Sequence, residues 1–210
     1  LVGSEMCIRD RMNNYFPLEE ISWANKYFLD ALYYRNCLSF QLEADCFIET
    51  IAKEDERYCI IRERVSKAGS SAKILDVGCG SGILSIIGLK LGAGHAVLTD
   101  IDPHAISASE ENFEVNHISK DQFEVYQGNV LDDKEFAASL GSKCYPVVVA
   151  NILADVIIML VKEIPVHLKK GGYFITSGII NLKEEAVRAA FAASEELEVV
   201  AVSYTHLRAH

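Results

Sequence analysis

The chain has 210 residues, of which 50% are hydrophobic and 24% charged, a composition typical of a globular protein with one domain and an appendage. Its formal net charge of −10 argues against a ligand held mainly by phosphate neutralisation, because nucleic-acid-binding proteins carry a basic face. No apolar run reaches the roughly 18 residues of a membrane span, and no signal-peptide pattern is visible, so we expect a cytosolic protein that binds neither nucleic acid nor membranes.

The two ends of the chain fit no predicted element. Residues 1–12 and 203–210 resemble translated sequencing-adapter read-through, so we interpret both as artefactual and leave them out of the fold; ordinary disordered termini are the alternative. Residues 13–70 follow a helical pattern, with apolar residues three and four apart, and end in a short linker at Ala68–Ser71. The predicted catalytic domain is therefore residues 71–202.

Within this domain, short apolar runs rich in β-branched residues alternate with helical patterns. The predicted strands are Ile74–Val77, Ala96–Thr99, Phe123–Tyr126, Val147–Ala150, Tyr173–Thr176 and Leu197–Ala201. The predicted helices are Gly82–Leu91, Pro103–Asn116, Lys134–Leu140, Ala154–Leu168 and Leu182–Ala193. Gly171 and Gly172 are expected to stop the fourth of these helices. The alternation predicts an α/β fold with a parallel sheet, helices on both faces, and a ligand at the carboxyl ends of the strands.

The strongest motif is Asp76-x-Gly78-x-Gly80-x-Gly82, where the first strand turns into the first helix. Glycines permit a tight turn and a close approach of the backbone to a ligand. The position three after Gly80 is Ile83, so the dinucleotide fingerprint is absent, and no G-K-[ST] follows either. Because an acid at the strand end suits a cationic ligand, we expect Asp76 near the ammonium and sulfonium of S-adenosylmethionine, directly or through a water.

Two further strand ends carry polar side chains. Asp100 ends the second strand, 22 positions after Gly78, where an acid binds ribose hydroxyls in Rossmann proteins. Asp102 is expected to cap the helix that begins at Pro103. Asn151 ends the fourth strand and offers a carbonyl acceptor to an amine and a donor to the cofactor. Capping of the next helix is the alternative role for Asn151.

The cysteines and histidines point to no further chemistry. The six cysteines form no C-x-x-C pair and have no histidine cluster beside them, which predicts free thiols rather than a disulfide framework or a metal site. His95, His104 and His117 lie on helix or loop patterns and are expected to be solvated rather than catalytic.

Five segments of the chain carry a resemblance to a known family: DVGCGSGILSI, LKLGA at Leu89–Ala93, TDIDP, VVVANILADV and LKKGGYFITSGI. They are similar to the family that methylates the eleventh protein of the large ribosomal subunit (PrmA-type enzymes). The resemblance covers Ile74 to about Ala201. It implies a Rossmann-like class I methyltransferase sheet, S-adenosylmethionine as methyl donor, and amino groups of a large-subunit ribosomal protein (lysine side chains and the N-terminal amine) as acceptors. It maps cofactor contacts onto Gly78, Asp100 and Asn151. Our own hypothesis is that the side-chain carbonyl of Asn151 also orients the acceptor amine.

The chain departs from the pattern of many methyltransferases at one place and from the family pattern at two. Many methyltransferases carry, after the third strand, an acid that contacts the adenine amine; here the candidate is Asn129. The family's Phe-Gly-Thr-Gly-Thr-His segment has no match between Asn13 and Ala72, and its closing strand with Gly-Glu-Trp is missing. We therefore expect a nearly complete cofactor site in a monomeric fragment. A class I enzyme for another protein or a small molecule, and an inactive truncated fragment, are the alternatives.

Overall fold

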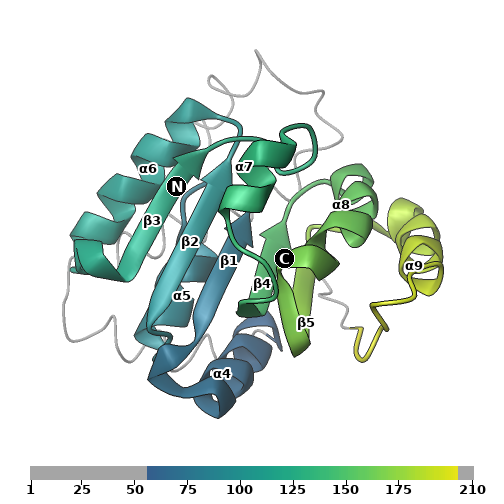
Figure 1. Ribbon diagram of the computed structural model, residues 1–210, viewed down its shortest axis with the longest axis horizontal. Coiled ribbons are helices and arrows are strands. Elements are labelled where there is room, and N and C mark those ends of the chain that lie inside the picture. Colours follow the sequence, from purple (N-terminus) through teal and green to yellow (C-terminus); the bar gives the residue numbers. More distant parts are fainter. Residues whose placement is uncertain (1–55, 203–210) are drawn as a thin grey trace, which may run out of the picture. The chain divides into compact units, whose positions relative to one another are not determined.

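The computed structural model describes residues 56–202, which Figure 1 draws in colour. The predictions for residues 1–55 and 203–210, which include both artefactual ends and most of the helical N-terminal segment, lie outside the described residues. The helices are α4 (Glu56–Ala68), α5 (Ile83–Lys90), α6 (Pro103–Val115), α7 (Lys134–Ser139), α8 (Ala154–His167) and α9 (Glu184–Ala192). The strands are β1 (Lys73–Val77), β2 (His95–Asp100), β3 (Phe123–Gln127), β4 (Tyr145–Asn151) and β5 (Leu168–Ser177). Among these residues no helix is long and apolar enough to cross a membrane.

The five strands form one parallel sheet in the order β3-β2-β1-β4-β5, which can be followed across Figure 1. β1 lies at the centre, between β2 and β4. From β1 the chain adds β2 and β3 on one side of the sheet and then β4 and β5 on the other. The predicted parallel sheet is confirmed, and the first five predicted strands and all five predicted helices of the domain are present. The switch in order places the ends of β1, β2 and β4 together, where doubly wound sheets bind ligands.

Helices cover both faces of the sheet. On one face, Ile74 of β1 lies against Gly88 of α5, which also lies near Ile61 of α4. On the other face, one buried cluster joins β1 and β4 to α7 and α8 through Leu75, Leu160 and apolar neighbours. Since β1 and β4 are buried on both faces, their sequences are continuous apolar runs rather than alternating ones.

Helix α4 belongs to the same packed body as the sheet, upstream of the predicted domain start at residue 71. Ile61 and Val65 are fully buried, and the guanidinium of Arg64 lies 3.6 Å from the centre of the Tyr173 ring on β5. The predicted linker forms, in part, a short exposed 3-10 turn at Gly69–Ser71. The predicted helical pattern is therefore confirmed over α4, whereas the domain start at residue 71 stays a prediction.

The predicted sixth strand at Leu197–Ala201 is wrong, since this segment forms neither strand nor helix. The backbone N–H of Leu197 instead donates to the Ser194 hydroxyl at 3.2 Å, and its side chain packs on the core cluster. β-Branched residues favour a strand only where a neighbouring strand satisfies the backbone groups. No such neighbour pairs with this segment among residues 56–202.

The predicted helix stop at Gly171 and Gly172 is also wrong. Helix α8 ends at His167, and Leu168 is already extended, so the glycines lie inside β5. Tyr145 of β4 pairs with Leu168, whereas Val147 pairs with Tyr173, which leaves extra residues on β5. The glycines therefore lie at an irregularity of the sheet, where Gly171 adopts a φ of +74°, and not at a helix C-terminus.

Candidate functional site

The carboxyl ends of the three central strands meet through the backbone of the glycine loop. The backbone N–H groups of Gly78 and Cys79 both donate to the Thr99 carbonyl of β2, at 2.8 and 3.1 Å. On the β4 side, a Cβ added to Gly78 would lie 2.4 Å from Cγ2 of Ile152, the residue after Asn151. The loop after β1 is thus in contact with the ends of both neighbouring strands.

All three glycines of the loop have backbone angles that other residues avoid. The φ angles are +74° at Gly78, +55° at Gly80 and +75° at Gly82. This agrees with the interpretation of the motif as a turn that only glycine permits, because left-handed backbone costs a side-chain-bearing residue roughly 1–2 kcal/mol. The loop is closed by a bond of 2.8 Å from the Gly82 N–H to the Cys79 carbonyl.

Helix α6 holds the outer side of the loop through two residues that sequence reasoning missed. The Ser109 hydroxyl donates to the Gly80 carbonyl at 3.0 Å, and the Asn112 amide donates to the Ser81 carbonyl at 2.9 Å. They lie three positions apart and therefore on one side of the helix. In the sequence, the spacing of these two small polar residues on one side of a predicted helix was the available indication that they contact the loop.

Asp100 supports the loop from the end of β2. One carboxylate oxygen accepts a bond of 2.9 Å from the Gly80 N–H, and the other accepts one of 3.0 Å from the Asp102 N–H. Each carboxylate oxygen can accept a second hydrogen bond, and the side chain is half-buried. The arrangement leaves acceptor capacity for a diol such as the ribose hydroxyls.

Asp102 and Asn129 make local contacts. Asp102 caps α6 as predicted, accepting the His104 N–H at 2.9 Å, and Pro103 follows as the first helical residue. The Asn129 amide donates to Asp132, and its carbonyl accepts the Leu131 N–H at 3.0 Å. The side chain of Asn129 therefore stabilises the turn after β3. A contact with adenine would have to use an amide or carbonyl group that already makes one of these two hydrogen bonds.

Asp76 lies beneath the loop rather than on its surface. Its side chain is 1% exposed and accepts a bond of 2.8 Å from the Ser85 hydroxyl of α5. The pKa of the Asp76 carboxyl is raised to about 7, mainly by burial; the Ser85 hydrogen bond lowers it in part, and the nearby Asp100 charge adds a smaller upward effect. Its predicted proximity to the cofactor stays a prediction; its contact in the structure is with the helix that follows the loop.

The raised pKa of Asp76 predicts that the domain loses stability as the pH rises. In the unfolded chain this carboxyl loses its proton near its ordinary pKa of 3.8, whereas in the folded chain it keeps the proton up to about pH 7. The folded state therefore binds more protons in that window, and its stability falls with rising pH. Relative to the unmodified chain, Asp76→Asn should gain roughly 3 kcal/mol between about pH 5 and about pH 8 in urea unfolding.

The matched control is Asp102→Asn, an exposed acid whose replacement can still cap α6. It should follow the pH dependence of the unmodified chain. A constant difference between Asp76→Asn and the unmodified chain across this pH range would contradict the prediction.

Asn151 is half-buried at the end of β4, and its side-chain amide has no hydrogen-bond partner among the described residues. The alternative role as helix cap is wrong, because α8 begins after Leu153 and has no side-chain cap. Its carbonyl oxygen faces Gly178, at which an added Cβ would lie only 3.0 Å away. An uncommitted amide at the switch point can accept from a bound amine and donate to a second ligand.

The close approach at Gly78 predicts a large loss of stability in Gly78→Ala. The new methyl group would meet Ile152 and would also occupy left-handed backbone, so we expect a loss of roughly 2–5 kcal/mol in urea unfolding. The matched control is Gly171→Ala, which has the same φ of +74° but nothing within 4 Å of the added Cβ. Equal losses in the two variants would show that the contact with Ile152 is unimportant.

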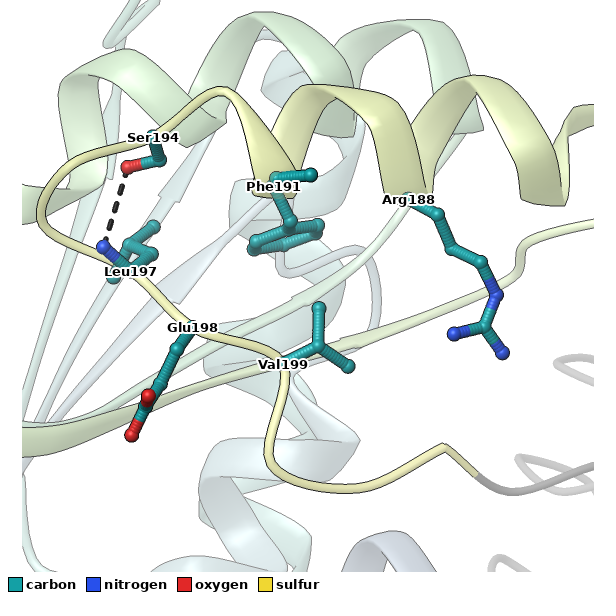
Figure 2. Close-up of a pocket in the computed structure, with 7 residues that line it drawn as sticks. Arg188, Phe191, Ser194, Leu197, Glu198 and Val199 are labelled. Atoms are coloured by element: carbon teal, nitrogen blue, oxygen red, sulfur yellow. Dashed lines mark hydrogen bonds between the residues drawn. The ribbon is translucent and has the colours of Figure 1, made fainter.

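A groove elsewhere on the domain contains none of the predicted site residues. It lies between α9 and the segment after it, and Figure 2 shows Phe191, Leu197 and Val199 along it. We place the candidate site at the strand ends instead, because the groove has a single acid, Glu198, beside the cationic Arg188, and no side-chain amide for an amine. Among residues 56–202 no group of three or more His, Cys, Asp or Glu side chains is placed to hold a metal ion.

The strand ends fit S-adenosylmethionine by three observations. The loop has glycine at three positions with positive φ, so a ligand can lie directly on a backbone that carries no side chain there. Asp100 retains acceptor capacity in the position suited to ribose, and its carboxylate beside the loop favours a cation over a pyrophosphate. The free amide of Asn151 lies across the loop from Asp100.

Comparison with known proteins identifies the family of the chain. The model of a family described as ribosomal protein L11 methyltransferase (PrmA) matches residues 57–206. A protein of Lachnospira eligens described as ribosomal protein L11 methyltransferase is 51% identical over 145 residues, which cover 69% of this chain and 46% of the relative. One from Agathobacter rectalis with the same description is 44% identical over 169 residues, covering 79% and 52%.

A solved structure supports the fold independently. The ribosomal protein L11 methylase of Lactobacillus delbrueckii subsp. bulgaricus superposes with a TM-score of 0.53 at 32% identity, covering 63% of this chain and 65% of the other. The chain spans about half the length of the curated relatives that it matches.

Proposed function

This chain belongs to the ribosomal protein L11 methyltransferase (PrmA) family, and from that premise we propose that its strand ends bind S-adenosylmethionine and transfer the methyl group to a large-subunit ribosomal protein. The acceptors that we propose are amino groups, namely lysine side chains and the N-terminal amine. The observation that carries this proposal is the uncommitted amide of Asn151, next to a glycine loop and opposite Asp100.

For this reaction the protein mainly has to place the methyl donor and the acceptor amine correctly. S-adenosylmethionine supplies an activated methyl group, because its sulfonium leaves as a neutral thioether. The amine lone pair forms the new N–C bond while the C–S electrons pass to sulfur, so the amine must be neutral and in line. Orientation of donor and acceptor can contribute roughly 7–11 kcal/mol to such a step.

The residues of the site divide this task. Asp100 holds the ribose hydroxyls, and the glycine loop lets the donor lie against the backbone. The Asn151 side-chain carbonyl accepts a hydrogen bond from the amine and so aims its lone pair at the methyl group. The amine, with an ordinary pKa of about 10.4 for lysine, loses its proton to water as it enters a partly desolvated site.

The test is methyl transfer from labelled S-adenosylmethionine to purified ribosomal protein L11, with identification of the modified amines by mass spectrometry. Labelled lysines or a labelled N-terminus would support the proposal. Binding of the donor without transfer would favour the fragment without activity, and transfer only to other proteins or to small molecules would favour a different acceptor.

We also propose that the chain acts as a monomer in the cytoplasm, where ribosomal proteins are made. Its net charge of −10 favours a basic protein partner over nucleic acid. Size-exclusion chromatography with light scattering would reveal a dimer, which would contradict the monomer.

A further inference from the structure

The segment from Gly178 to Lys183, which joins β5 to α9, lies directly beside the free amide of Asn151. Gly178 has φ +85°, and a Cβ added there would lie 3.0 Å from Oδ1 of Asn151 and 3.0 Å from the Ile152 carbonyl oxygen. The first residue of this segment is therefore in close contact with the side chain that we propose to hold the amine.

The far end of the same segment is joined to the start of α8. Nζ of Lys183 lies 2.8 Å from Oδ1 and 3.1 Å from Oδ2 of Asp155, so one ammonium contacts both carboxylate oxygens. Asp155 comes four residues after Asn151, in the first turn of α8. The Lys183 N–H also donates to the Ile180 carbonyl at 2.9 Å, which closes the segment into a 3-10 turn. Both ends of the segment are thus attached to the chain that carries Asn151.

Between these ends the segment divides its apolar side chains between core and solvent. Ile179 packs on the cluster of Ala154, Ile157 and Val187, which joins α8 to α9. Ile180 and Leu182 point outward and are 43% and 91% exposed. The core therefore uses one of the three apolar side chains, and the other two are exposed to solvent.

We propose that the Lys183–Asp155 ion pair is a positioning pair that holds the segment 178–183 as a wall of the acceptor side of the site. This inference rests on the proposed function. The pair itself contributes little to folding, because its side chains are 43% and 68% exposed and exposed pairs are screened by water. Its effect is on where Ile180 and Leu182 lie relative to the amine held by Asn151.

The experiment compares Lys183→Met, which keeps the apolar stem but removes the charge, with the charge swap Lys183→Asp/Asp155→Lys. In Lys183→Met we expect the KM for ribosomal protein L11 to rise about two- to fivefold, the range that a surface ion pair can supply. The kcat, the Kd for S-adenosylmethionine and the urea midpoint should change little. The charge swap should recover most of the KM. The matched control is Lys67→Met, which breaks another exposed ion pair, with Glu63 on α4, and should leave every parameter unchanged.

Amide hydrogen exchange reports on the segment without any turnover. The backbone N–H of residue 183 should exchange faster in Lys183→Met than in the unmodified chain and regain protection in the charge swap. Unchanged exchange, an unchanged KM, or a KM that the charge swap fails to recover would each overturn the proposal. If the unmodified chain transfers no methyl group, the proposed function fails, and the exchange data alone decide whether the pair holds the segment.

Discussion

Asp100→Ala should weaken binding of S-adenosylmethionine at least 100-fold. The substitution removes the carboxylate that accepts the Gly80 N–H at 2.9 Å and the Asp102 N–H at 3.0 Å, and with it the proposed contacts to the ribose. Hydrogen bonds to charged groups contribute about 1.5–3 kcal/mol each. If two such bonds to the ribose hydroxyls are lost, the Kd for S-adenosylmethionine rises roughly 10²- to 10⁴-fold. Isothermal titration with S-adenosylmethionine measures the change directly.

Asp102→Ala is the matched control for this measurement, since it removes a second acid only two positions away. Asp102 caps α6, so its loss should cost about 1 kcal/mol of stability but leave the Kd within about threefold. A Kd for Asp100→Ala within the same range as Asp102→Ala would refute the ribose role. Thermal unfolding of both variants separates lost binding from lost folding.

Asn151→Ala should reduce kcat by roughly 10²- to 10³-fold, the size of effect seen when one preorganised hydrogen-bonding group is removed from an active site. The side-chain amide has no hydrogen-bond partner among residues 56–202, so its removal breaks no bond within this part of the chain and should cost little stability. The measurement is the rate of transfer to ribosomal protein L11 at saturating donor, with the donor Kd determined separately.

Asn129→Ala provides the comparison for Asn151→Ala, because it removes the amide at the end of a different strand. Its amide bonds Asp132 and the Leu131 N–H, so its loss should loosen the turn after β3 and act on donor affinity rather than on kcat. If kcat in Asn151→Ala matched that in Asn129→Ala, the orientation of the amine would have to be assigned to another group.

Lys183 and Asn151 have different roles in our proposal. Asn151 touches the reacting amine in our proposal, whereas Lys183 acts only through the segment that it holds. Loss of Asn151 should therefore lower kcat, and loss of Lys183 should raise the acceptor KM. The two variants together distinguish contact with the reacting atoms from placement of the protein acceptor.

Features encoded within a few neighbouring residues were predictable from the sequence. The glycine motif from Asp76 to Gly82 predicted a strand, a turn and a helix, and its three positive φ angles follow from the absence of Cβ atoms. The cap at Asp102 and the parallel order of βα units are likewise local, since period, capping and turn chemistry act over one or two turns of chain.

Contacts between distant parts of the chain were decided only by the tertiary structure. Ser109 reaches Gly80 across 29 positions, and Lys183 reaches Asp155 across 28, because α6 and the β5–α9 segment dock where they do. The same reason explains the wrong strand at Leu197–Ala201, whose β-branched residues had no neighbouring strand to pair with. The sequence thus determined which groups reach the ends of the strands, whereas packing decided which of them are committed and left the Asn151 amide free for a ligand.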